Sequence, residues 1–183
     1  MEQSDLLLFL CRHLNQIGCR YLITGSHATI AFGEPRFTND IDVVVDLELR
    51  DLDRFCDGFP QQEFYLSRDA AKEAVAQRHM FNIIHPTSGL KIDVVISKQT
   101  PFDALRFNRG VQIPIADDCG AVFTSAEDII LQKMKWHRSG GGQRHLDDIA
   151  GVVRIQGDKL DRAYIAEQAG KLEVLDLWRD LSP

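Results

Sequence analysis

The sequence predicts an α/β (α+β) protein, with a mixed β-sheet flanked by helices and followed by a helical C-terminal part. Three observations support this class. Apolar or alternating runs at 21–24 and 39–46 indicate strands, and two further runs at 80–84 and 90–96 enclose a turn and indicate a β-hairpin. Beyond residue 125 a resemblance to a capping box and a glycine linker indicate a series of helices. The 183 residues can bury a substantial core, and we expect an α/β core at 1–124 with helical residues 125–183 packed on it.

The N-terminal segment predicts a helix, a strand and a second, shorter helix. Apolar residues at helical spacing indicate the first helix at 4–17, and Gly18 ends it. Gly25 and Ser26 then interrupt the strand run before small residues that can form the second helix. Backbone N–H groups at the start of a helix have no intrahelical partner, and glycine lets the backbone approach a ligand closely. Gly25 and Ser26 are therefore predicted to bind phosphate.

Aspartates mark the predicted strands. Asp40 and Asp42 are two residues apart, so their side chains share one face of the strand while Ile41 packs on the other. Two carboxylates roughly 7 Å apart on one face repel each other unless a cation lies between them, and Mg²⁺ prefers oxygen ligands. Asp93 lies in another β-branched run. Three strand aspartates and a phosphate-binding turn are typical of a two-metal site for phosphoryl or nucleotidyl transfer.

The remaining core segments follow simple patterns. Helices are expected at 49–56, 69–78 and 102–107, a short strand at 64–66, and a strand at 111–115. Pro114 favours an edge position for this last strand. Asp117 and Asp118 are interpreted as a solvated turn in preference to metal ligands.

The C-terminal part is predicted to be almost entirely helical. Ser125 with Asp128 resembles a capping box that opens a helix ending near residue 138. Three glycines at 140–142 form a linker, and helices are expected at 144–155, 159–170 and 174–181.

Composition excludes several function classes. The net charge of −6 argues against non-specific coating of nucleic acid, because such binding requires phosphate neutralisation. The four cysteines and the histidines lack zinc-ligand spacing, so we expect reduced thiols and no zinc. The apolar run at 6–10 is too short for a membrane span, and no signal peptide is indicated. A cytoplasmic protein without a membrane partner is expected.

The spacing of these residues carries a family resemblance. Gly25-Ser26, thirteen intervening residues, Asp40-Ile41-Asp42 and a later strand Asp93 resemble the signature of the DNA polymerase β-like nucleotidyltransferase superfamily. The lead-in Pro35-Arg36-Phe37-Thr38-Asn39-Asp40 is similar to that of small stand-alone bacterial enzymes related to the AbiEii and MenT toxins. The resemblance covers roughly residues 5 to 155. It implies the nucleotidyltransferase fold.

The resemblance also implies an activity and its partners. An NTP would donate NMP to an acceptor hydroxyl and release pyrophosphate, with two Mg²⁺ ions, or Mn²⁺, at the site. Asp40 and Asp42 would contact both ions, and Asp93 only the ion that activates the acceptor. Relatives that are toxins favour tRNA or a protein as acceptor, and a role in a toxin-antitoxin or phage-defence pair with a cognate antitoxin. A small molecule such as an aminoglycoside is also compatible.

Four further residues are assigned to nucleotide binding by the resemblance. Lys133 would contact the triphosphate and Asp148 would lie near the site; alternatively, Lys133 is a solvated helix residue and Asp148 pairs with Arg144 one turn away. Arg36 precedes the aspartate pair and is expected at a phosphate or at the acceptor. Thr38 belongs to the same lead-in.

Two other function classes stay open at this point. A catalytically silent relative would keep the fold as a nucleotide-binding or partner-binding module, although this chain retains all three acids. A metal-dependent phosphoesterase would also use clustered aspartates, but it gives no reason for a Gly-Ser turn at this spacing. The chain departs from many AbiEii-like members at His145, where they carry an aspartate.

Overall fold

The structure, a computed structural model, describes residues 1–181 and divides into two compact units. The first unit comprises Met1–Ser26 and Thr38–Phe123. The second unit comprises His27–Phe37 and the chain from Thr124 onward. The sheet lies in the first unit, and the C-terminal helices lie in the second.

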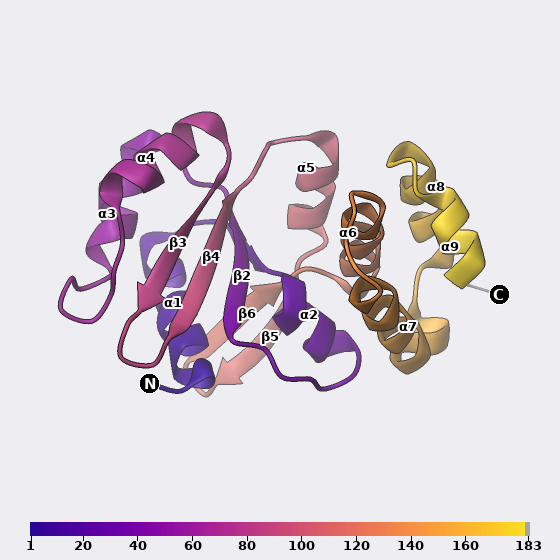
Figure 1. Cartoon of the computed structure of the whole chain (residues 1–183), viewed down its shortest axis with the longest axis horizontal. Coiled ribbons are helices and arrows are strands. Elements are labelled where there is room, and N and C mark those ends of the chain that lie inside the picture. Colours follow the sequence, from indigo (N-terminus) through magenta and orange to yellow (C-terminus); the bar gives the residue numbers. More distant parts are fainter. Residues whose placement is uncertain (182–183) are drawn as a thin grey trace. The chain divides into compact units, whose positions relative to one another are not determined.

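A mixed sheet forms the centre of the first unit (Figure 1), which confirms the predicted fold class. In the described residues it has six strands in the order β3-β4-β2-β1-β6-β5. β2 pairs with β4 and β1 with β6 in parallel, and the other pairs are antiparallel. β5 is an edge strand, as its proline predicts. The strands are β1 (Tyr21–Ile23), β2 (Asp40–Val45), β3 (Met80–His85), β4 (Leu90–Ile96), β5 (Val111–Ala116) and β6 (Cys119–Phe123).

The register of the central strands decides which side chains meet. In the antiparallel pair of β1 and β2, Ile23 lies opposite Val43, and the chain continues with Thr24 N–H donating to the Asp42 carbonyl at 2.9 Å. In the parallel pair of β2 and β4, Asp42 lies beside Asp93. Asp42 of β2 therefore adjoins both the end of β1 and Asp93 of β4.

Helices of the first unit follow the expected positions with small shifts. They are α1 (Gln3–Ile17), α3 (Leu52–Asp57), which follows the 3-10 turn η1 (Leu49–Asp51), α4 (Arg68–Gln77) and α5 (Pro101–Asn108). α1 starts one residue early because Glu2 and Asp5 form its capping box. The strand expected at 64–66 is reduced to a single bridge between Tyr65 and Ile84.

The core of the first unit lies between helix and sheet. Figure 1 shows α1 behind the strands, and its Leu6, Leu10 and Leu14 are fully buried. The alternate residues Ile41 and Val43 of β2 are also inaccessible. A cluster of aromatic rings packs edge to face and in stacks: Phe9, Phe55, Phe59, Phe64 and Phe81. Apolar burial on one face of β2 fixes its aspartates on the opposite face.

The second unit is helical. It contains most of α2 (Gly25–Phe32), together with α6 (Ala126–Arg138), α7 (Arg144–Gln156), the 3-10 turn η2 (Gly157–Lys159), α8 (Arg162–Lys171) and α9 (Leu175–Leu181). Ser125 caps α6, as predicted. α8 starts later than expected because Asp161 caps it. Among residues 1–181, no helix is both long enough and apolar enough to cross a membrane.

Residues 27–37 belong to the second unit because they pack on α7. The Gln156 amide donates to the Phe32 carbonyl at 2.7 Å, and Arg154 pairs with Glu34. Gly33 lies so close to Val152 that a Cβ would come within 3.0 Å of a methyl group of Val152. The first unit is therefore interrupted by a segment that folds with the C-terminal helices.

Candidate active site

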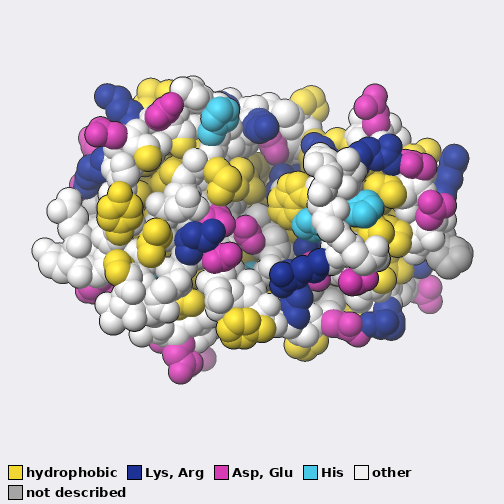
Figure 2. Space-filling view, viewed as in Figure 1, with side chains coloured by type: hydrophobic (Ala, Val, Ile, Leu, Met, Phe, Trp, Pro, Cys, Tyr) yellow, Lys and Arg dark blue, Asp and Glu magenta, His cyan; other side chains and the backbone are white. Residues whose placement is uncertain are grey.

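Three carboxylates line one face of two neighbouring strands in the first unit. Asp42 of β2 lies beside Asp93 of β4, and Asp40 lies beside Lys91. Residues two apart on a strand share a face, so these four side chains are on the same side of the sheet. We call Asp40, Asp42 and Asp93 the carboxylate face. Figure 2 shows acidic side chains gathered around a basic one on the molecular face over β2 and β4.

Asp93 is held by two side chains that the sequence analysis did not select. The Lys91 ammonium lies 2.9 Å from Oδ2 of Asp93 and 3.8 Å from Oδ2 of Asp40. The Asn82 amide, on β3 opposite Asp93, donates to Oδ1 of Asp93. The pKa of Lys91 is raised, chiefly by its hydrogen bond to Asp93 and further by the charges of Asp93, Asp40 and Asp42. Lys91 is therefore a charged member of the site.

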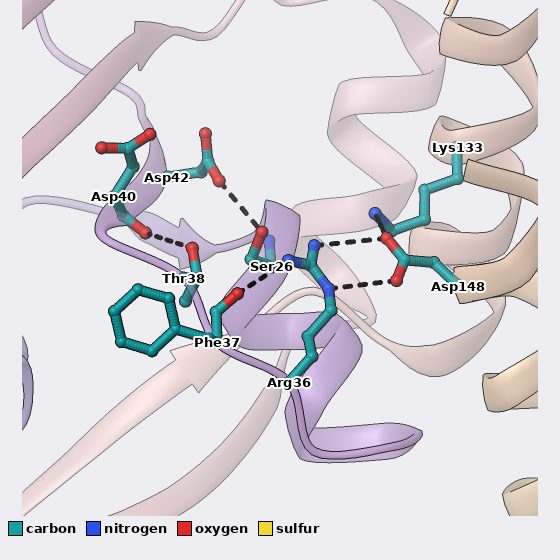
Figure 3. Close-up of polar contacts among 8 residues, drawn as sticks. All are labelled: Ser26, Arg36, Phe37, Thr38, Asp40, Asp42, Lys133 and Asp148. Atoms are coloured by element: carbon teal, nitrogen blue, oxygen red, sulfur yellow. Dashed lines mark hydrogen bonds and ion pairs between the residues drawn. The ribbon is translucent and has the colours of Figure 1, made fainter. Parts of the chain in front are cut away.

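The predicted phosphate-binding turn lies against Asp42. Gly25 has φ +56°, and a Cβ at this position would lie 2.8 Å from Asp42 Cβ and closer still to the carboxylate. The Ser26 backbone N–H points toward Asp42 Oδ2 at 3.4 Å (Figure 3). Thr38 donates its hydroxyl to the Asp40 carbonyl at 3.4 Å. A helix N-terminus that attracts anions thus directly adjoins one of the carboxylates.

In the second unit, the predicted residues Arg36, Lys133 and Asp148 form one ionic group (Figure 3). Lys133 Nζ lies 2.6 Å from Asp148 Oδ2, and Arg36 Nε lies 3.1 Å from Asp148 Oδ1. The side chains of Lys133 and Asp148 are only 3% and 7% exposed. A solvated position for Lys133 is therefore wrong, and Asp148 pairs with Lys133 and Arg36. Contact of these residues with a nucleotide stays a prediction.

The donor set of the carboxylate face suits a hard divalent cation. It is composed of carboxylate oxygens, which Mg²⁺ and Mn²⁺ prefer, and the Lys91 ammonium already stands as a cation between Asp93 and Asp40. In the part of the chain that the structure describes, no three His, Cys, Asp or Glu side chains form a preformed metal cluster. The carboxylates would have to turn toward one point, which side-chain rotation allows. Metal ligation by all three aspartates stays a prediction.

The position of Lys91 beside Asp93 could have been predicted from the sequence, whereas that of Asn82 could not. Lys91 precedes Asp93 by two residues in the same predicted strand, so the strand period alone places both on one face. Asn82 meets Asp93 only through the register of the hairpin, which depends on the geometry of its turn at residues 86–89.

Comparison with known proteins yields structural neighbours only. No protein-family model and no curated protein matches this sequence. A nucleotidyltransferase-like antigenic protein from Paracoccidioides brasiliensis is similar in structure, with a TM-score of 0.56 and 17% identity, over 93% of this chain and 89% of that one. ANT(2″)-Ia, solved with adenylyl-2″-tobramycin, has a TM-score of 0.56 and 12% identity over 97% of both chains.

A third neighbour is JHP933 from Helicobacter pylori, with a TM-score of 0.56 and 15% identity, over 93% of this chain and 74% of that one. The chain has the fold of nucleotidyltransferase-like proteins. Structural similarity at such low sequence identity establishes the fold alone. The chemistry has to be argued from the residues themselves.

Proposed function

We propose that the protein is a metal-dependent nucleotidyltransferase that moves NMP from an NTP to an acceptor hydroxyl and releases pyrophosphate. The observation that carries this proposal is the meeting of three features at Asp42. Asp93 lies beside it on the parallel strand, Asp40 shares its face, and the Gly25–Ser26 turn abuts its carboxylate. A phosphate site that touches carboxylates is electrostatically reasonable only where a cation offsets both anions.

Each residue then has a defined task. Gly25 has no Cβ, so a phosphate would approach the backbone closely, and the backbone N–H groups at the start of α2 would donate to it. Asp40, Asp42 and Asp93 would hold Mg²⁺ or Mn²⁺. When bound, such ions stabilise the charge that develops on the transferred phosphoryl group and lower the pKa of the acceptor hydroxyl. Asn82 restrains the carboxylate plane of Asp93.

The acceptor is proposed from resemblance and from one neighbour. The lead-in at residues 35–42 resembles toxin enzymes and favours a tRNA end or a protein hydroxyl, with a cognate antitoxin as partner. ANT(2″)-Ia, whose complex contains adenylyl-2″-tobramycin, supports an aminoglycoside-like small molecule as the third class. The acceptor therefore has to be found by offering all three classes together.

The test is transfer of label from α-labelled NTPs to total RNA, lysate protein and aminoglycosides, with Mg²⁺ or Mn²⁺. The wild-type protein is compared with Asp42→Asn, which keeps the side-chain volume but removes the charge. Transfer should fall by about 100-fold or more, as expected for loss of a metal ligand. The matched control is Asp46→Asn, one residue beyond the C-terminal end of β2, which removes the same charge outside the carboxylate face.

Equal transfer by wild type and Asp42→Asn would refute the assignment of the site. Binding of NTP with Mg²⁺ but no transfer to any acceptor class would favour the silent nucleotide-binding module. Asp46→Asn should behave like wild type in either case, so a loss in that variant would indicate a general effect of charge or folding.

A further inference from the structure

Lys91 occupies a position within the carboxylate face that the proposed function does not use. Its ammonium is 2.9 Å from Asp93 and 3.8 Å from Asp40, and its side chain is 34% exposed. We propose that Lys91 is an internal cation of the acidic site, which takes the place of one divalent ion and limits the nucleotide-free protein to a single divalent ion per chain. This inference rests on the proposed function, because it concerns the same carboxylates.

Asp93 has a hydrogen-bond donor on each of its two carboxylate oxygens. Oδ2 of Asp93 accepts from the Lys91 ammonium and Oδ1 accepts from the Asn82 amide. Both oxygens of the carboxylate are therefore engaged by donors. Mg²⁺ requires an oxygen at about 2.0 to 2.1 Å, which leaves no room for an ammonium on the same lone pair. An ion at Asp93 would therefore either take the lone pair that Lys91 uses or lie next to its ammonium, and both arrangements weaken the pair of Lys91 and Asp93.

The charge of Lys91 acts on the carboxylates and on any approaching ion. Three carboxylates on one face repel each other, and the Asp93 side chain is only 13% exposed, so water screens its charge poorly. The positive charge of Lys91 offsets part of this repulsion. The same positive charge repels any divalent ion that approaches Asp93 or Asp40. Lys91 thus stabilises the ion-free site and opposes its full loading.

Asp42 is differently placed, which is why one divalent ion is still expected. In β2 it lies beside Asp93, whereas the contacts of Lys91 within 4 Å are to Asp93 and Asp40. Its carboxylate faces the Ser26 N–H. An ion that uses Asp42 and one oxygen of Asp40 leaves the pair of Lys91 and Asp93 intact. Loading a second ion at Asp93 comes at the expense of that pair.

The test is the number and affinity of Mn²⁺ ions bound without nucleotide, measured from the electron paramagnetic resonance signal of free Mn²⁺. Four proteins are compared: wild type, Lys91→Met, Lys91→Gln and Lys98→Met. Lys91→Gln keeps a hydrogen-bond donor toward Asp93 without the charge. Lys98 is an exposed lysine just beyond β4, so Lys98→Met is a control that removes the same charge.

Wild type and Lys98→Met should bind one Mn²⁺ per chain. Both Lys91 variants should bind two, with at least about tenfold tighter binding of the first ion, as removal of one nearby positive charge predicts. Equal number and affinity in all four proteins would overturn the role of Lys91 and leave the proposed function standing. Absence of Mn²⁺ binding in all four would overturn both.

Folding of the variants is followed by circular dichroism. If Lys91→Met is unfolded without metal, Lys91→Gln carries the comparison. If both are unfolded, refolding on addition of Mn²⁺ supports the inference, since a divalent ion then replaces the missing charge. Failure of Mn²⁺ to refold either variant would make Lys91 a purely structural residue and overturn it.

Discussion

Gly25 combines a left-handed backbone conformation with a position against the Asp42 side chain. Its φ of +56° lies in the left-handed region, which glycine adopts without the steric cost that other residues have. The sequence identified Gly25 as part of a phosphate-binding turn, but its proximity to Asp42 depends on the antiparallel register of β1 and β2. Lys91 illustrates the same difference, because its face was predictable while its ion pair with Asp93 was not.

Substitution Gly25→Ala should reduce both stability and transfer activity. A Cβ would lie 2.8 Å from Asp42 Cβ, so rotation of the aspartate alone cannot relieve the clash and the strand must shift. Gly89→Ala is the matched control, because Gly89 has φ +71° and nothing lies within 4 Å of the added Cβ. Thermal unfolding should show a loss of about 1–2 kcal/mol for Gly89→Ala and a clearly larger loss for Gly25→Ala. Equal losses would contradict the contact with Asp42.

At the scale of elements, α6 and α7 are joined by a buried ion pair. Lys133 and Asp148 are almost inaccessible, and a buried ammonium is stable only with a partner. The capping box at Ser125 and the glycine linker at 140–142 predicted both helices, and the family resemblance pointed to both residues. It did not show that they pair with each other, because the contact is between residues fifteen apart in sequence that only helix packing brings together.

Asp148→Ala should destabilise the second unit by about 3 kcal/mol, because it leaves the buried Lys133 ammonium without this carboxylate. Both tryptophans of the chain, Trp136 and Trp178, lie in the second unit, so their fluorescence during urea unfolding reports on that unit. The neighbouring Asp147→Ala removes an exposed carboxylate from the same helix and should cost less than about 1 kcal/mol. A similar cost for the two variants would contradict a structural role for the ion pair.

A double variant without either charge separates this structural role from a role in nucleotide binding. Lys133→Met combined with Asp148→Leu removes both charges and should recover part of the stability lost in Asp148→Ala. If such a stable double variant also transfers label normally, the pair serves folding only. If its stability recovers while transfer stays lost, Lys133 or Asp148 also acts on the substrate.

At the scale of the whole molecule, the order of a mixed sheet followed by helices was predictable from the period of the apolar residues. The start of α6 and the end of α1 were also predictable, because Ser125 and Gly18 mark them. The inclusion of residues 27–37 in the second unit was not, since it depends on contacts with α7 such as that of Gln156 with Phe32. The shared face of Asp40 and Asp42 was predictable, because residues two apart on a strand point to the same side of the sheet.

The central claim is that the carboxylate face catalyses attack at the α-phosphate of an NTP. The most direct measurement follows two labels in parallel reactions, one in the α-phosphate and one in the γ-phosphate, with Mg²⁺ and the combined acceptors. Nucleotidyl transfer predicts that the α-label enters an acceptor while an equal amount of the γ-label is released as pyrophosphate. Release of the γ-label as orthophosphate, with no α-label in any acceptor, would contradict the claim and indicate a phosphoesterase.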